Sequence, residues 1–139
     1  MQVKEVSTAS DIQQTWEVMH LLRPHLKEEE YISLVKEMIK DGYRMAYVEE
    51  NGKAVSVIGY RHIQFLFNGK HIYIDDLSTL SDQRGKGYAS KLLDYIIAIA
   101  KENGYKSVTL DSGTHRSVAH KLYFNKGFTI VGYHFLKPL

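Results

Sequence analysis

The sequence has no cysteine, only two prolines and almost no excess of charge. Without cysteine, the chain has no disulfide scaffold, no thiolate metal site and no cysteine nucleophile. The 18 basic and 16 acidic side chains leave a formal net charge of +2, so charge gives no reason to expect nucleic acid as a partner. The seven histidines show no repeated short spacing, and we therefore expect no metal site.

Long apolar runs are also missing. No stretch reaches the roughly 20 apolar residues that cross a bilayer, and residues 1–5 do not have the pattern of a secretory signal peptide. We therefore expect a cytoplasmic protein with no membrane partner. The 139 residues, 44% of them hydrophobic, suit one domain with a sizeable core, which we expect to span residues 1–139.

Hydrophobic spacing and turn residues predict an alternation of strands and helices. Asn51-Gly52 and Asn68-Gly69 separate three β-rich runs, which is typical of type I′ hairpins in an antiparallel meander. Ser10, three residues before Gln13, has the spacing of a helix capping box. In order, we expect a strand at 2–7, helices at 10–22 and 27–40, strands at 43–49, 53–67 (with a bulge near Gly59) and 71–80, a helix from 85 or 86 to 104, a strand at 106–111, a helix capped by Ser112 or Thr114 and ended by Gly127, and a last strand at 128–136.

The segment 82–90 joins the third meander strand to the most periodic helix through two glycines. Backbone N–H groups at a helix N-terminus, with the fixed charges of Arg84 and Lys86 nearby, suit a bound phosphate. The segment is not a P-loop, because Gly85-Lys86-Gly87 lacks the spacing and the following hydroxyl residue. It is not a dinucleotide fingerprint either, because Ser90 stands where the third glycine belongs.

A third phosphate-binding pattern, Arg/Gln-x-x-Gly-x-Gly/Ala, fits the run Arg84-Gly85-Lys86-Gly87-Tyr88-Ala89. Together with the strand before it and with Ala119, Tyr123 and Gly127-Phe128 downstream, this run resembles the GNAT superfamily of acetyl-CoA-dependent N-acetyltransferases. The resemblance covers roughly residues 74 to 128. It implies an α/β (α+β) fold with a mixed, mostly antiparallel sheet of about six or seven strands, flanked by four helices, with a splayed parallel pair at the cofactor site.

The resemblance also implies acetyl-CoA, or coenzyme A, as the bound cosubstrate. The loop would hold the pyrophosphate, and backbone groups of residues 77–79 would pair with the pantetheine arm, the N–H of Leu77 facing the thioester carbonyl. Arg116 stands where many family members carry an asparagine that binds this arm, so Asn125 becomes a candidate in its place. The implied cofactor-binding residues are Leu77, Ser78, Thr79, Arg84, Gly85, Lys86, Gly87, Tyr88, Ala89 and Asn125.

For catalysis, the resemblance places Tyr123 near the sulfur as the general acid for the departing thiolate. The general base is open between Asp75, Asp76 and Asp111, with histidines of the last helix or a water as further options. Since Asp75 and Asp76 are adjacent on a strand, we expect their side chains on opposite faces of the sheet.

The activity that this resemblance implies is transfer of acetyl from acetyl-CoA to a primary amine, of a small molecule, by direct attack in a ternary complex. The acidic candidates favour a cationic amine. Two alternatives stay open, a CoA-binding regulatory module with little turnover and a protein or peptide N-acetyltransferase. Because family members pair sheet edges between subunits, the resemblance also allows a homodimer.

Overall fold

The computed structural model describes residues 2–139, and the chain divides into two compact units, one ending at Thr109 and the other comprising Leu110–Leu139. The first unit contains β1 (Val3–Glu5), α1 (Ala9–Gln14), α2 (Trp16–Leu22), α3 (Glu28–Lys40), β2 (Tyr43–Glu50), β3 (Lys53–Phe65), β4 (Gly69–Thr79), the 3₁₀ turn η1 (Ser81–Gln83) and α4 (Tyr88–Glu102); β5 (Val108–Leu110) ends at its boundary.

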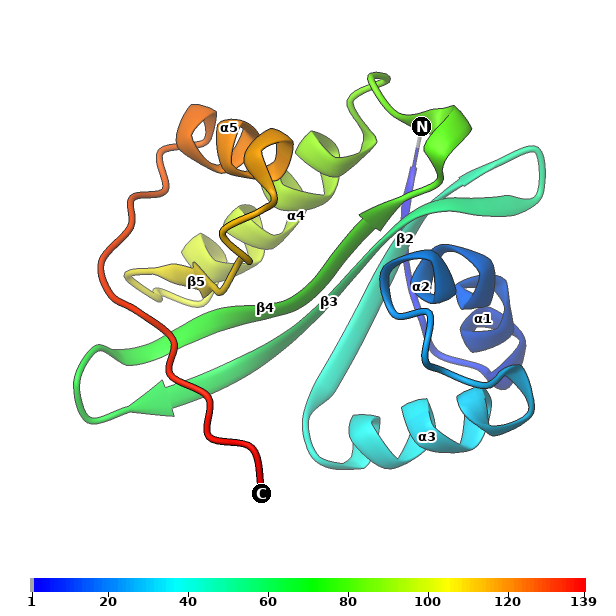
Figure 1. Cartoon of the computed structure of the whole chain (residues 1–139), viewed down its shortest axis with the longest axis horizontal. Coiled ribbons are helices and arrows are strands. Elements are labelled where there is room, and N and C mark those ends of the chain that lie inside the picture. The colour runs from blue at the N-terminus through cyan, green and yellow to red at the C-terminus, as the bar shows by residue number, and fades with distance from the viewer. Residues whose placement is uncertain (1) are drawn as a thin grey trace. The chain divides into compact units, whose positions relative to one another are not determined.

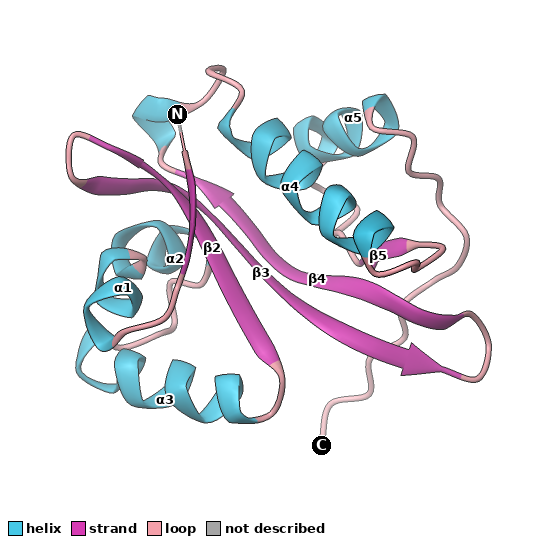
Figure 2. Ribbon diagram, turned by 180° about the vertical axis from the view of Figure 1, so that it is seen from behind, coloured by secondary structure: helices cyan, strands magenta, loops and turns pink. Residues whose placement is uncertain are grey.

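The sheet has the strand order β1-β2-β3-β4-β5, with antiparallel neighbours up to β4 and a parallel β4-β5 pair (Figure 1). Helices α1–α3 cover one face of the sheet and α4 covers the other, as the view from behind confirms (Figure 2). The inward stripe of α4, including Leu92, Leu93 and Ile96, is fully buried. The predicted mixed sheet with helices on both faces is therefore confirmed.

The first predicted helix is two helices, because the chain breaks at Thr15. The buried Thr15 hydroxyl donates to the carbonyl of Ile12 (2.7 Å) and lies 2.7 Å from the Tyr31 hydroxyl, so it competes with the helical backbone. The prediction of Ser10 as the cap is also wrong. Thr8 caps α1 in a capping box with Asp11, whose carboxylate accepts from the N–H groups of Ser7 (2.9 Å) and Thr8 (3.0 Å). These bonds lower the pKa of Asp11.

The two Asn-Gly hairpins differ from each other. Asn51 (φ 53°) and Gly52 (φ 76°) both adopt the left-handed region, which confirms the type I′ turn between β2 and β3. The second turn was wrongly predicted as type I′. Phe65 pairs with Gly69, so residues 66–68 form a three-residue loop between β3 and β4. In the Asn68-Gly69 pair, only Gly69 has a positive φ (71°).

The second unit contains α5 (Ser117–Asn125) followed by residues 126–139, which form no helix or strand. The predicted strand at 128–136 is therefore wrong, and the sheet has five strands rather than six or seven. The apolar side chains of this segment are largely exposed, with exposed fractions of 89% for Val131 and 91% for Phe135. A run of β-forming residues becomes a strand only where a neighbouring strand supplies hydrogen bonds and a packed face.

Candidate active site

A β-bulge in β4 forms the centre of the candidate site. Gly59 of β3 pairs with Asp76 and Tyr60 pairs with Ile74, so Asp75 is an extra residue without a partner of its own. The bulge predicted near Gly59 is confirmed. A Cβ at Gly59 would lie 1.9 Å from the Tyr43 hydroxyl oxygen and 2.7 Å from an Asp76 carboxylate oxygen, so this position has room only for glycine.

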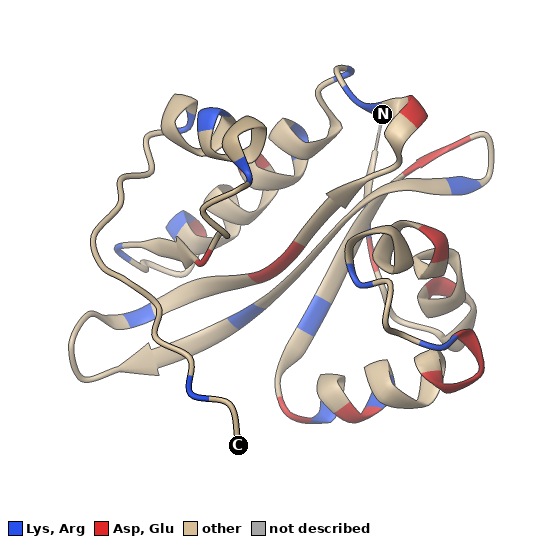
Figure 3. Ribbon diagram, viewed as in Figure 1, with Lys and Arg blue, Asp and Glu red and all other residues tan. Residues whose placement is uncertain are grey.

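The bulge places both aspartates in one cluster of ion pairs. Asp76 accepts from the Tyr43 hydroxyl (2.7 Å) and from Nη2 of Arg23 (2.9 Å), and Asp75 accepts from Nε of Arg61 (2.9 Å). Arg23 also donates to the Asp75 backbone carbonyl (3.1 Å). Figure 3 shows the acidic stretch of β4 beside a basic stretch of β3. The prediction that the two carboxylates face opposite sides of the sheet is wrong, because the extra residue interrupts the strand alternation.

The electrostatics of the cluster distinguish its two carboxylates. Burial raises the pKa of Asp75, although the bond from Arg61 opposes the rise. Burial, and then the charge of Asp76, raises the pKa of Tyr43 well above its ordinary value, so Tyr43 stays a donor. Asp76 accepts from two side chains, Arg23 and Tyr43, whereas Asp75 accepts only from Nε of Arg61, which its two oxygens share, so Asp75 is the better suited of the pair to accept a proton. Two arginines balance two aspartates, so the cluster carries no excess negative charge.

Beyond the bulge, β4 directs alternate N–H groups away from β3. The Leu80 N–H donates to the Val55 carbonyl of β3 (2.9 Å). Because N–H groups alternate in direction along an antiparallel strand, the N–H of Ser78 also points toward β3. The N–H groups of Leu77 and Thr79 point toward the side of β4 where β5 lies. The Ser78 hydroxyl is bonded to the Val18 carbonyl (3.1 Å), so the side chain of Ser78 is also occupied within the protein.

The predicted phosphate loop opens the α4 helix. Gly85 (φ 77°) and Gly87 (φ 84°) both adopt the left-handed region, and Gly87 is an N-cap without a side-chain hydrogen bond. The first helical bond runs from the Lys91 N–H to the Gly87 carbonyl (3.0 Å), so the N–H groups of Tyr88, Ala89 and Ser90 have no acceptor inside the helix. Residues 84–87 are exposed. The helix begins at Tyr88 rather than at 85 or 86.

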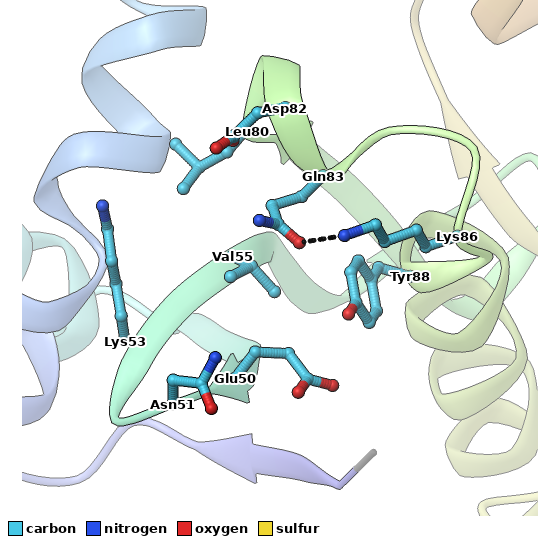
Figure 4. Close-up of a pocket in the computed structure, with 9 residues that line it drawn as sticks. All are labelled: Glu50, Asn51, Lys53, Val55, Leu80, Asp82, Gln83, Lys86 and Tyr88. Carbon is cyan, nitrogen blue, oxygen red and sulfur yellow. Dashed lines mark hydrogen bonds between the residues drawn. The ribbon is translucent and has the colours of Figure 1, made fainter.

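A pocket of about 280 Å³ lies beside this loop, lined by the β2-β3 hairpin and residues 80–88. Figure 4 shows Lys86 bonded to Gln83 there, Nζ to Oε1 at 3.0 Å. The Tyr88 side chain is buried, and its pKa is raised first by burial and then by its hydrogen bond with Glu50. At the start of the helix, Tyr88 also offers its backbone N–H to a ligand.

The second unit carries the other candidate residues. The partly buried Tyr123 packs edge-on against Phe128, with ring centroids 5.9 Å apart, and burial raises its pKa, so the phenol is protonated at neutral pH. Asp111 is half-exposed, with its carboxylate 3.6 Å from Nδ1 of His134. Asn125 is exposed at the end of α5. Asp111, Tyr123 and Asn125 belong to the second unit, whereas the bulge and the loop belong to the first.

Comparisons with known proteins give the family of this chain. The model of the acetyltransferase (GNAT) family matches residues 9–128. The chain belongs to the GNAT family. A GNAT relative from Bacillus subtilis (strain 168), named "Uncharacterized N-acetyltransferase YhdJ", is 32% identical over 99% of this chain and 98% of its own length.

Solved GNAT structures share the fold. A ribosomal-protein-alanine N-acetyltransferase from Brucella melitensis superposes with a TM-score of 0.85 at 14% identity, covering both chains fully. The aminoglycoside N-acetyltransferase AAC(6')-Iy in complex with CoA gives 0.85 at 12% identity over 99% of this chain and 93% of that one. This protein is accordingly an acyl-CoA-dependent N-acetyltransferase, with acetyl-CoA as the GNAT cosubstrate.

The described residues, 2–139, contain neither a metal centre nor a membrane-spanning helix. No group of three or more histidine, aspartate and glutamate side chains could hold a metal ion there. In the same range no helix has the length and apolarity needed to span a bilayer.

Three residues of the candidate site were missed from the sequence, namely Arg23, Tyr43 and Arg61. Arg23 lies 53 positions before Asp76, and no local pattern marks such a pair. Arg61 and Asp75 become neighbours across the sheet only through the bulge, which shifts the register by one residue. Gly59, the residue that permits the bulge, was the sequence signal for the bulge itself.

Proposed function

We propose that this protein transfers acetyl from acetyl-CoA to a primary amine of a small molecule, by direct attack in a ternary complex. One observation carries the proposal: the bulged part of β4 leads directly, through η1, to the uncapped N-terminus of α4. The first element offers a carboxylate beside outward N–H groups, and the second offers free N–H groups and the positive end of a helix dipole.

The cofactor would lie along both elements. The N–H groups at the start of α4 bind the pyrophosphate, with Arg84 and Lys86 adding positive charge and Gly85 and Gly87 allowing close approach. The pantetheine arm follows the edge of β4, where the N–H of Thr79 faces it and the N–H of Leu77 stabilises the thioester oxygen as charge develops there. Asn125 contributes a side-chain contact from α5.

The chemistry needs one base and one acid. Asp75 takes a proton from the acceptor ammonium, and the neutral amine attacks the thioester carbonyl carbon. As the new C–N bond forms, the C–S bond breaks and the thiolate takes a proton from the Tyr123 hydroxyl, whose raised pKa keeps it protonated until that step. Asp76, bonded on both oxygens, positions Arg23 and Tyr43. Asp111 is the second candidate for the base.

The loop assignment is tested by Gly87→Val, with Gly104→Val as the matched control. Both glycines have a positive φ, 84° and 71°, and open space around the added Cβ, so both substitutions impose similar backbone strain. Only the side chain at 87 would enter the phosphate cradle. Calorimetric titration with CoA should show at least about a 100-fold loss of affinity for Gly87→Val and little change for Gly104→Val. Equal affinities in the two variants would refute the assignment.

The acceptor class is tested by a screen for CoA release and for a mass increase of the acceptor, using polyamines, aminoglycosides, amino acids and peptides. Acetylation of a small amine is the expected result. Tight CoA binding without turnover on any acceptor would favour the regulatory module, and turnover restricted to peptides would favour a peptide N-acetyltransferase.

A further inference from the structure

We propose that Arg23 and Arg61 form a carboxylate-binding subsite, so that the acceptor is an amine that also carries a carboxylate, such as an amino acid. The inference rests on the proposed function and names its substrate class. It revises the expectation of a cationic acceptor, which was drawn from the aspartates before their partners were known.

The outer surface of the cluster is cationic. The side chains of Arg23 and Arg61 are 41% and 30% exposed, whereas those of Asp76 and Asp75 are 12% and 18% exposed. The carboxylates thus lie beneath the guanidinium groups, and a molecule arriving from solvent meets the arginines first. A cationic polyamine would face like charge at this surface, and a carboxylate would face complementary charge.

Both guanidinium groups keep unused donors. Arginine has five N–H donors in a planar fork. Among the bonds formed within residues 2–139, Arg61 donates to Asp75 only from Nε, and Arg23 donates from Nε and Nη2. The terminal nitrogens of Arg61 and Nη1 of Arg23 remain for a ligand. A bidentate bond to a carboxylate needs two parallel N–H groups, and the two terminal nitrogens of Arg61 can supply both.

The arginines are also held in place before a ligand arrives. The Arg61 guanidinium lies 5.3 Å from the centroid of the Tyr43 ring, and its Nε is fixed by Asp75. Arg23 is fixed by two bonds to Asp76 and one to the Asp75 carbonyl. Side chains anchored in this way lose little conformational freedom on binding, which favours selective recognition.

The position of the subsite matches the geometry of an amino acid. Asp75 precedes Leu77 by two residues, about 7 Å along a strand. In an α-amino acid the amine and the carboxylate share one carbon. A carboxylate bound by Arg61 would therefore hold the amine beside Asp75 and within reach of a thioester at Leu77.

The test compares each amino acid with its own carboxamide as acceptor, for example phenylalanine with phenylalaninamide. The two members of a pair differ only in the group that meets the arginines. With the wild-type protein, kcat/KM for the acid should exceed that for the amide by about 10- to 100-fold. Arg61→Gln should remove most of this preference and Arg61→Lys should restore part of it, while KM for acetyl-CoA stays the same. Arg44→Gln is the control, because Arg44 donates to the backbone carbonyls of Ile39 and Tyr43 rather than to either aspartate of the cluster.

The possible failures are distinguishable. The subsite is refuted if kcat/KM is the same for amides as for acids, or if Arg61→Gln keeps the preference for acids with an unchanged unfolding midpoint. Either result leaves the proposed acetyltransferase activity intact. If no member of any pair is acetylated and the acceptor screen finds no other small amine that is, the proposed function is refuted. The subsite is then decided by calorimetric binding of the acids, which supports it only if Arg61→Gln abolishes that binding and Arg44→Gln does not.

Discussion

Replacing Gly59 with alanine should be among the most destabilising single-methyl changes in this protein. The new Cβ would lie 1.9 Å from the Tyr43 hydroxyl oxygen, where ordinary contact is 3.4–4 Å, so the buried ring must retreat by roughly 1.5 Å. That movement breaks the 2.7 Å bond to Asp76. Overpacking costs about 1–3 kcal/mol, and a lost hydrogen bond to a charged group costs about 1.5–3 kcal/mol.

The sum, about 2.5–6 kcal/mol, is a large part of the roughly 5–15 kcal/mol that stabilises an ordinary domain. Urea unfolding followed by circular dichroism measures it, with Gly132→Ala as the control, because a Cβ at Gly132 meets nothing within 4 Å. In the double variant with Tyr43→Phe, the nearest clashing atom is gone, so the double variant should be more stable than the sum of the single effects predicts. A Gly59→Ala protein within about 0.5 kcal/mol of wild type, or strictly additive effects, would refute the reasoning.

Five further substitutions test the chemistry and one cap. Tyr123→Phe should lower kcat by about 100-fold or more while CoA affinity stays unchanged; an unchanged kcat removes its role as acid. Replacing Asp75, Asp76 and Asp111 with asparagine one at a time should lower kcat most at Asp75. Because the pKa of Asp75 is raised, the wild-type rate should also rise as pH increases through the pKa of this carboxylate. A larger loss of kcat at Asp111 would assign the role of general base to Asp111 instead. Asp11→Ala should cost about 1 kcal/mol at pH 7. Because folding lowers the Asp11 pKa, this contribution is present above the unfolded value of 3.8 and disappears as pH falls through the folded value. A difference that persists in acid would contradict it.

The features predicted correctly from the sequence were those that neighbouring residues determine. Asn51-Gly52 specifies its turn through two positive φ angles, and the spacing of Leu92, Leu93 and Ile96 specifies the buried stripe of α4. The order of the elements followed from such local signals, and so did the family resemblance of the phosphate loop.

The errors arose where distant residues decide the local structure. Thr15 ends a helix because its hydroxyl meets Tyr31, 16 positions away. The two aspartates share a face because Asp75 is an extra residue opposite β3, which no property of Asp75 itself reveals. The two arginines that neutralise them come from α2's C-terminal end and from β3, so the charge of the site depended on tertiary contacts. Sequence reasoning identified the acids and missed their counterions.

The bulge at Asp75 also has a consequence for changes in chain length. Removing a residue away from the bulge in the paired part of β4 would turn every side chain on one side of the deletion to the opposite face of the sheet. Removing Asp75 would leave Ile74 opposite Tyr60 and Asp76 opposite Gly59, as they are now, and would restore a regular ladder. Position 75 is therefore the place where β4 tolerates a one-residue deletion, and the proposed base occupies a residue that the sheet itself does not need.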